Sequence, residues 1–565
     1  MRQRTTFFHK NEDGIEPTSL KVARRSISGS DVLAVREDRI TLSLQELPAE
    51  LQELLRKSQE LHIRWASPYP YESIGPWNSR LPPGLHVFYT PGQGEKTGPG
   101  PELLCPLIRT TFGVSDCSTL LESFTRLPND RFSHSAAYQY YHPLPSLTHF
   151  VHYANKYACL PDSSSSSSPS SDCTQKIDRL ASATSLDFSY DTISHAAKLT
   201  ATWPRESQPI SLSNEHADHP GHRVEVGILT PDESPHVEPH ELGVTGLLTV
   251  LGEDTKPSPV LFSFPSRHMP APPPLPQQQR STFSAAFLSP TGLHPTLQLR
   301  FEGPTRAPVV EEGEDGEEES PCSLHAYLTL PRSIFADRYQ LADELFLASK
   351  NLTALRYASQ PVDLEAPDYV MQVWGSSVLL ELRPPSSSSS SSTRTRTTAG
   401  KADSDKEGET SWTAQIPLHL RYLAPAPGGY AEIEVPYPAV FWACPAEEGT
   451  KFPNSPFDRA NLGYDGLFGP RTQFWHVSPE PMKKLLGEEG GWDDGVGVGV
   501  LMNSVKVPVL DLDKAAWVRS GTAAVVLLGF AWVVWKLVGV YVRSGYGGSD
   551  QGVRKEKEAG EKKMQ

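Results

Sequence analysis

Residues 521–542 are the stretch that most constrains what this chain can fold into. They read GTAAVVLLGFAWVVWKLVGVYV and carry a single charge, Lys536. A helix needs about 20 mostly apolar residues to cross a bilayer, and this run supplies them. Lys536 lies near enough to the end of the run for its ammonium group to reach the interface. A buried core helix is the alternative, but such helices are seldom this long and this apolar. The sequence therefore predicts one membrane-spanning helix.

Two signals disagree about the orientation of this helix. Positive charge stays on the cytoplasmic side, and basic residues are denser after the span than before it. Residues 543–565 should then be cytoplasmic and residues 1–520 should lie across the membrane. Residues 1–20, however, contain no apolar core of the kind that a cleavable signal peptide needs. A chain with one span near its end and no signal fits a tail-anchored cytosolic protein, so the residues alone leave both orientations open.

Proline and glycine contents favour strands and loops over long helices. The chain has 52 prolines and 41 glycines among 565 residues, and proline is poorly tolerated inside helices. Its net charge of −15 argues against nucleic acid as a partner, because phosphate binding needs a basic surface. The composition therefore favours a mainly β protein that carries the C-terminal helix.

Alternating apolar residues support this class. Such residues alternate in Leu61 to Trp65, in Cys322 to Leu330 and in Ile416 to Tyr422. Period-two alternation is typical of sheets with one buried face. We expect β-sandwich-like domains with disordered insertions. The predicted division is an N-terminal β-rich domain at 1–263 with a Ser-rich insertion at 161–173, a Pro-rich linker at 264–295, a second β-rich domain at 296–480 with an insertion at 384–412, a juxtamembrane stalk at 481–520, the helix at 521–542 and a basic tail at 543–565.

Six cysteines give an even count without any CxxC pair, so no structural zinc site is expected. Facing an oxidising lumen they would pair, whereas in the cytosol they would be buried thiols. Cys322 and Cys444 are the two cysteines of the second domain, and they would form a disulfide with each other if the domain is oxidised. The pairing of the other four stays open. They are Cys105, Cys117, Cys159 and Cys173.

The histidines do not indicate a metal site. His142, His149 and His152 lie close together in sequence, but no carboxylate or cysteine accompanies them at a matching spacing. Partly buried surface histidines are the preferred interpretation. A second group lies among prolines and acids and fits a solvated loop. Its members are His216, His219, His222, His236 and His240.

No catalytic motif stands out either. Asp511 and Asp513 form a D-x-D, which holds a metal and a sugar phosphate in some glycosyltransferases, but two aspartates at this spacing occur often by chance. A transferase that uses a lipid-linked donor needs several spans to enclose the lipid, and this chain has one. No G-x-S-x-G, H-E-x-x-H or P-loop occurs. We therefore predict a protein without an activity, a cofactor or a small-molecule substrate of its own.

Several segments resemble the PIG-X family, whose fungal members include the protease B non-derepressible protein. Their order is that of the family, and one C-terminal span follows. They are LPRSIFADRYQL (330–341), NLTA (351–354), VDLEAPDYV (362–370), IPLHLRY (416–422) and PYPAVFWACP (436–445).

This resemblance implies a non-catalytic, stabilising subunit of glycosylphosphatidylinositol (GPI) mannosyltransferase I. That enzyme adds the first mannose to the GPI precursor in the endoplasmic reticulum, and its multi-span catalytic subunit is the expected partner. The resemblance also implies a lumenal N-terminal domain and a cytoplasmic tail, in agreement with the charge asymmetry. Two alternatives are kept: a lumenal chaperone for a subset of ER proteins, and a tail-anchored cytosolic adaptor that uses the Pro-rich segment.

Asn351-Leu-Thr353 is the one N-x-S/T sequon of the chain with an allowed middle residue. The PIG-X resemblance places an asparagine of this kind here, which implies a lumenal glycan on Asn351. Aromatic Phe441 and Trp442 are candidate partner contacts, although core positions are the commoner fate of such strand residues. Within the span, small residues and Lys536 suit helix packing, although a lipid-facing position is equally allowed. The small residues are Gly521, Ala523, Ala524 and Gly529.

Overall fold

The fold is known from a computed structural model, and the account below concerns only the part of the chain that it describes. These residues are 1–72, 74–92, 99–128, 137–159, 171–214, 221–232, 240–272, 280–303, 305–308, 311–312, 318–359, 363, 365–385, 411–452, 455–459, 461–481 and 499–544. They divide into two compact units. The first holds 1–422 and 433–505, and the second holds 423–432 and the residues from 506 onward.

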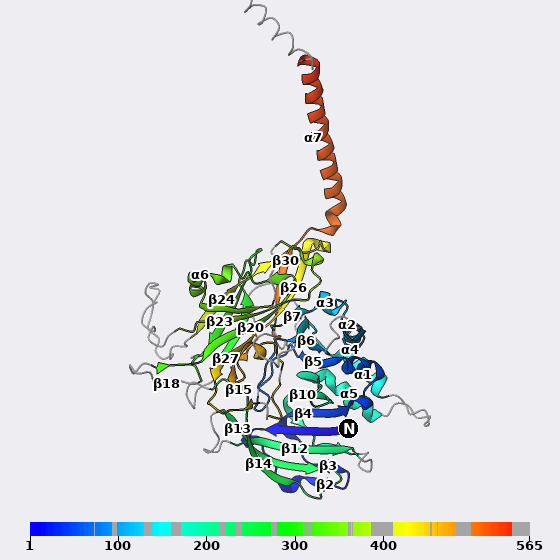
Figure 1. Ribbon diagram of the computed structural model, residues 1–565, viewed down its shortest axis with the longest axis vertical. Coiled ribbons are helices and arrows are strands. Elements are labelled where there is room, and N and C mark those ends of the chain that lie inside the picture. Colours follow the sequence, from blue (N-terminus) through cyan, green and yellow to red (C-terminus); the bar gives the residue numbers. More distant parts are fainter. Residues whose placement is uncertain are drawn as a thin grey trace, which may run out of the picture. The chain divides into compact units, whose positions relative to one another are not determined.

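An 11-stranded sheet organises the N-terminal part of the first unit (Figure 1). All neighbouring strands are antiparallel except β1 and β12, which run parallel from Arg2 opposite Arg223 to Phe8 opposite Leu229. The order across the sheet is β14 (Ser258–Pro265), β13 (Glu241–Val250), β12 (Arg223–Asp232), β1 (Arg2–His9), β4 (Val32–Ser43), β10 (Ala196–Gln208), β9 (Ser185–Asp191), β5 (Ser58–Ala66), β6 (Gly84–Pro91), β8 (Tyr138–His142) and β7 (Thr125–Arg126).

Short amphipathic helices pack against this sheet. Leu54 and Leu55 on α1 and Leu104 and Ile108 on α2 are fully buried at helical spacing, and they join one core cluster with strand residues such as Val87. The helices are α1 (Ala49–Arg56), α2 (Pro99–Phe112), α3 (Leu120–Ser123), α4 (Thr148–Ala158) and α5 (Ser171–Asp178). A small sheet of β11 (Ser211–Ser213), β3 (Ser26–Ser28) and β2 (Lys21–Ala23) covers a second cluster.

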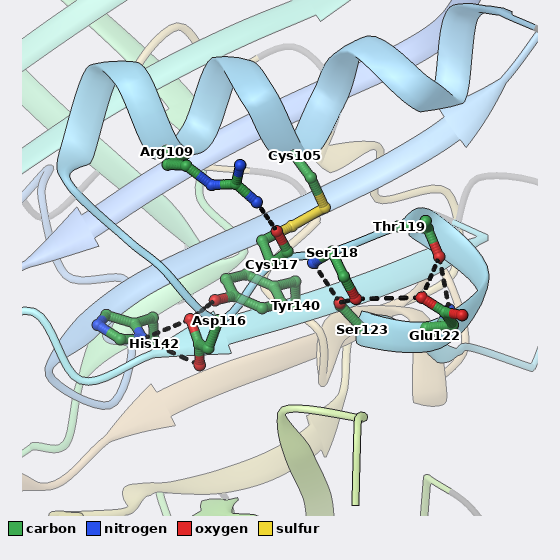
Figure 2. Close-up of a disulfide and its surroundings, with 10 residues drawn as sticks. All are labelled: Cys105, Arg109, Asp116, Cys117, Ser118, Thr119, Glu122, Ser123, Tyr140 and His142. Carbon is green, nitrogen blue, oxygen red and sulfur yellow. Dashed lines mark hydrogen bonds and ion pairs between the residues drawn. A yellow bond between two sulfur atoms is a disulfide. The ribbon is translucent and has the colours of Figure 1, made fainter.

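Two disulfides crosslink the segments that contain helices α2, α4 and α5. Cys105 of α2 is bonded to Cys117, whose carbonyl oxygen accepts a hydrogen bond from Arg109 at 2.8 Å (Figure 2). Cys159, which follows α4, is bonded to Cys173 of α5. The structure thus pairs the four cysteines whose partners the sequence leaves open.

Two further sheets form the C-terminal part of the first unit. A six-stranded sheet has the order β15 (His268–Pro270), β28 (Thr472–His476), β27 (Ala439–Pro445), β20 (Ser323–Pro331), β23 (Gly375–Leu382) and β22 (Leu352–Ala358). A four-stranded sheet has the order β24 (Trp412–Pro417), β17 (Thr296–Glu302), β16 (Thr282–Phe287) and β29 (Ser478–Pro479). The remaining described elements include β18 (Glu311–Glu312), β19 (Glu318–Glu319), β21 (Ile334–Phe335), α6 (Glu344–Ser349), β25 (His419–Leu420), β26 (Tyr430–Pro436) and β30 (Met502–Pro508).

Both faces of β20 are buried, which differs from the predicted single buried face. Leu324 to Leu330 are all buried, including His325, Tyr327 and Thr329. The additional cover comes from the N-terminal part: the amide of Gln139 on β8 donates to the Tyr327 hydroxyl at 3.0 Å. Ser377 on β23 also donates to Gln139, at 3.2 Å. The N-terminal and C-terminal sheets therefore share buried contacts.

These buried contacts between the N-terminal and C-terminal sheets differ from the predicted division into separate domains. The segment predicted as a linker, 264–295, contributes β15 to the six-stranded sheet and β16 to the four-stranded sheet, because its strands pair with β28 and β17. Part of the predicted stalk at 481–520 is strand β30. Residues 161–170, 386–410 and 482–498, which belong to the predicted insertions and stalk, lie outside the described residues.

The second unit carries the membrane helix. Helix α7 (Ala515–Ser544) contains the predicted span 521–542, and an 18-residue window within residues 512–543 has a mean hydropathy of 2.1, apolar enough to cross a bilayer. Backbone hydrogen bonds join the residues before α7 to residues 423–432: Ala426 donates to Leu510 at 3.1 Å and Val509 donates to Gly429 at 2.9 Å. A mainly β protein with one C-terminal candidate membrane helix is therefore confirmed.

Candidate functional site

Three of the segments that resemble the PIG-X family meet in the first unit. Strand β21 pairs with β25, so that Ile334 lies opposite Leu420 and Phe335 opposite His419. The third segment joins them at its end, where the Asp368 amide donates to the Tyr422 carbonyl oxygen at 2.9 Å. The described residues of stretches 330–341, 362–370 and 416–422, far apart in the sequence, are thus joined by backbone hydrogen bonds.

Arg421 holds this region together. Its side chain is buried, its Nη1 donates to the carbonyl oxygens of Asp363 and of Ala366, the latter at 2.7 Å, and its guanidinium lies 4.6 Å from the centre of the Phe335 ring. Its backbone amide donates to Ser333 at 2.9 Å. Burial lowers the pKa of Arg421, while Asp363 and Asp368 act in the opposite direction. One cation therefore holds the loop that contains Asp363 and Ala366 against β21.

The loop at 363–370 has its own internal bonds. The Asp363 carboxylate accepts from the amides of Glu365 and Ala366, at 3.0 and 3.3 Å. Burial raises the pKa of Asp368, and Arg332, 3.5 Å away, partly offsets this. These bonds define the backbone from which Tyr369 projects.

The loop between β21 and α6 is fixed as well. Asp343 caps α6, because its carboxylate accepts from the amides of Leu345 and Phe346 at 2.9 and 3.1 Å. His419 lies within hydrogen-bond distance of the Gln340 side chain, at 3.0 Å. Burial lowers the pKa of His419, and the nearby His294 lowers it further.

Large apolar side chains are exposed on these fixed loops. We call this set the motif surface, and it consists of Tyr339 (65% exposed), Leu345 (85%), Tyr369 (64%), Val370 (61%) and Tyr422 (70%). Exposed apolar groups gathered in one region and bordered by charged residues are typical of protein interaction sites. Such a surface can bind another protein, and it contains no arrangement of nucleophile and base. Neither sequence periodicity nor any single motif reveals it, because it arises only when the three segments meet.

Asn351 is exposed at the start of β22. Its backbone has a positive φ of 57°, and its side-chain Nδ2 donates to the Thr413 carbonyl oxygen at 2.7 Å. The Thr353 hydroxyl lies 3.5 Å from the Leu382 carbonyl oxygen. A glycosylated asparagine keeps one N–H on Nδ2, so a glycan at Asn351 is compatible with this bond.

Cys322 and Cys444 are bonded to each other, with 4.3 Å between their Cα atoms. Cys322 directly precedes β20 and Cys444 belongs to β27, and these two strands pair. All six cysteines of the chain are thus in disulfides.

Phe441 and Trp442, candidate partner contacts from the sequence, lie in the core instead. Phe441 is fully buried among Tyr464, Phe468 and Phe474, and Trp442 is 5% exposed. Both belong to β27, whose residues from Ala439 to Cys444 are all buried, so both faces of the strand are covered. Both residues thus take the commoner of the two expected fates, a position in the core, and the alternative of a partner contact is wrong.

The histidines and the D-x-D have structural partners. His142 lies 3.2 Å from Asp116, and His149 contacts the Thr111 carbonyl oxygen at 3.3 Å (Figure 2 shows His142). Asp511 accepts from the amide of Asp513 at 3.0 Å, as expected for a helix cap. Within the described part of the chain, no three histidine, cysteine or acidic residues gather as a metal site. His216, His219 and His236 lie outside it.

Lys536 contacts two aromatic rings of α7. Its ammonium lies 5.4 Å from the Trp535 ring and 5.8 Å from the Trp532 ring. Gly521 and Gly529 have open space beside them, as a lipid or a partner helix would require. The structure thus leaves both uses of this helix face open.

Comparison with known proteins identifies the family. The PIG-X / PBN1 family model matches residues 290–538, which include the motif surface, Asn351 and most of the membrane helix. Protein pbn1 of Neurospora crassa is 53% identical over 97% of both chains. Protein PBN1 of Gibberella zeae is 44% identical, and protein pbn1 of Emericella nidulans 40% identical, each over 96% of this chain and 97% of its own length. The chain therefore belongs to the PIG-X / PBN1 family of GPI-anchor-related membrane proteins.

Proposed function

We propose that this protein is the non-catalytic, stabilising subunit of GPI mannosyltransferase I in the endoplasmic reticulum. Its partner is the multi-span catalytic subunit, which adds the first mannose to the GPI precursor. The observation that carries the proposal is membership of the PIG-X / PBN1 family over nearly the full chain. An exposed motif surface and an exposed membrane helix on one chain suit a protein that binds a membrane partner on two sides.

The disulfides support the orientation within this proposal. Three disulfides lie before the span, and such bonds persist in oxidising compartments such as the ER lumen. Basic residues after the span, Arg543, Arg554 and Lys555 among them, favour the cytoplasmic side. Both arguments favour a lumenal position for residues 1–520 and a cytosolic position for the tail. A tail-anchored cytosolic adaptor would face a reducing compartment, which disfavours that alternative.

Depletion of this protein tests the proposal. We expect the catalytic mannosyltransferase subunit to fall to a small fraction of its normal level and GPI precursors without mannose to accumulate. The full-length tagged protein, solubilised in detergent, should also co-purify that subunit. If the subunit stays at its normal level while other ER proteins disappear, the protein acts as a lumenal chaperone and the proposal is wrong.

Removing the sequon tests the orientation independently. We expect the wild-type protein to lose mass on endoglycosidase treatment and Asn351→Gln to lack this shift. Thr353→Ala should abolish the shift equally, because it destroys the sequon while leaving Asn351 and its bond to Thr413 in place. Asn454→Gln is the matched control and should keep the glycan, because proline at the third position makes Asn454 a non-acceptor. A wild-type protein that carries no glycan would contradict lumenal glycosylation at Asn351.

A further inference from the structure

We propose that the motif surface is the face that binds a lumenal loop of the multi-span catalytic subunit, and that this loop carries at least one lysine or arginine. The inference rests on the proposed function and adds the contact surface to it. Tyr369 and Tyr422 would be its central contacts, because the Asp368–Tyr422 hydrogen bond holds their backbones next to each other. Tyrosine suits this role, since it gives a large contact area at a low cost in side-chain entropy.

The charge at this surface determines the chemistry of the partner segment. Stretches 332–345, 363–370 and 416–422 contain six carboxylates and three guanidinium groups, so acidic groups outnumber guanidinium groups two to one. One guanidinium, Arg332, already lies beside Asp368, at 3.5 Å. Most of the remaining carboxylates are exposed, so the tyrosines stand in an acidic border that attracts a cationic segment.

The loops that present the surface are held in place before any partner arrives. Arg421 bonds both Asp363 and Ala366, Asp343 caps α6, and β21 pairs with β25. A surface that is already ordered loses less conformational entropy on binding. The fixed loop positions also argue against a loosely held loop whose apolar side chains are exposed by chance.

The continuity of the chain favours a membrane protein as the partner that binds the motif surface. Tyr422 is followed directly by Leu423, the first residue of the unit that carries α7. Ala426, four residues after Tyr422, is hydrogen-bonded to Leu510 and Leu512, just before the helix begins. The family model likewise includes the motif surface and most of the span in one continuous match. A partner with both lumenal loops and membrane helices can use both.

Site-specific photo-crosslinking in the full-length protein tests this surface. A benzophenone amino acid would replace Leu345, Tyr369 or Tyr422 one at a time in cells, followed by irradiation and purification. Ile193 and Leu261 are matched controls, because they are 87% and 70% exposed but lie outside the family match. Co-purification of the catalytic subunit without irradiation is measured on the same samples.

The outcomes separate the surface from the function. We expect crosslinks from positions 345, 369 and 422 to lumenal loops of the catalytic subunit, at least ten-fold above the two controls. Normal co-purification without such crosslinks would contradict the motif surface as the binding face and leave the proposed function unaffected. Crosslinks from these positions to lipid or to another protein would also contradict the motif surface as the binding face. If the unmodified protein does not co-purify the catalytic subunit, the proposed function itself is contradicted.

A pair of exposed substitutions gives a second test that does not depend on the probe. With the benzophenone at Leu345, we expect Tyr369→Ala/Tyr422→Ala to lower both the crosslink yield and co-purification by ten-fold or more, because central aromatic contacts dominate interfaces. Arg300→Ala, at an exposed site on β17, is the control and should change neither. Unchanged co-purification in the double variant would contradict the proposal.

Discussion

Replacing both Cys322 and Cys444 with alanine is expected to lower the free energy of unfolding by about 5 kcal/mol. The bond joins residues 122 positions apart, and a crosslink restricts the unfolded chain more as the enclosed loop lengthens. Such a loss is comparable with the whole stability of many domains. The measurement is urea-induced unfolding of the full chain in detergent, followed by tryptophan fluorescence.

The disulfide between Cys105 and Cys117 provides the matched control. It closes a loop of 12 positions, so its double alanine variant should lose only about 3 kcal/mol. The midpoint of unfolding should therefore fall further for the Cys322/Cys444 variant than for the Cys105/Cys117 variant. Equal losses, or a larger loss for the short loop, would show that the long-range bond does not stabilise the fold by this mechanism.

Acid is expected to destabilise the protein steeply below pH 6.5, because five buried histidines are neutral in the folded state. Burial lowers the pKa of each: to about 3 for His62 and His476, to about 4 for His86 and His325, and well below 6.5 for His268. An unfolded histidine titrates near 6.5, so the unfolded chain takes up protons first as the pH falls.

The size of this effect follows from linkage. At pH 5.5 each such histidine costs about 1.4 kcal/mol of stability, or about 7 kcal/mol for all five. Asp458 acts in the opposite direction: burial raises its pKa to about 6, so the folded state gains about 1 kcal/mol as it is protonated. The net expectation is full stability at neutral pH and unfolding between about pH 6 and pH 5.

Thermal unfolding of the detergent-solubilised chain between pH 7.5 and 5 measures this effect. His268 and His476 lie 3.0 Å apart through their ring nitrogens, so His268→Asn/His476→Gln should reduce the steepness of the acid loss by about two fifths. Gln139→Ala is the control, since it removes the buried side-chain hydrogen bonds to Tyr327 and Ser377 but no histidine. It should lower the melting temperature at every pH without changing the slope. A melting temperature that stays constant from pH 7.5 to 5 would contradict the prediction.

The sequence predicts local structure well where one physical signal dominates. The apolar run at 521–542 has no competing interpretation of equal weight, and α7 contains it. Alternation from Cys322 to Leu330 predicts a strand, and β20 is that strand. Alternation cannot tell, however, that His325 and Tyr327 are buried as well. That requires knowing that β8 brings Gln139 over the same strand, and no short-range pattern contains this contact.

The candidate site shows the same limit. Resemblance to the family singles out the segments around Phe335, Tyr369 and Arg421, but their meeting point depends on β21 pairing with β25 and on the bonds of Arg421. Phe441 takes the commoner of its two expected fates, because an aromatic side chain in a motif can serve the core rather than a partner. The burial of every residue from Ala439 to Cys444 on β27 decides that case.

The position of β1 in the middle of its sheet has a consequence for biogenesis. Arg2 to Phe8 are synthesised long before their parallel partner β12, which begins only at Arg223. At roughly 5–20 residues per second, about 10–40 s pass between the synthesis of the two strands. During that interval β1 has an unpaired edge that other chains can join. The 11-stranded sheet therefore cannot be completed around β1 until β12 has been synthesised, so its assembly waits for a segment far along the chain.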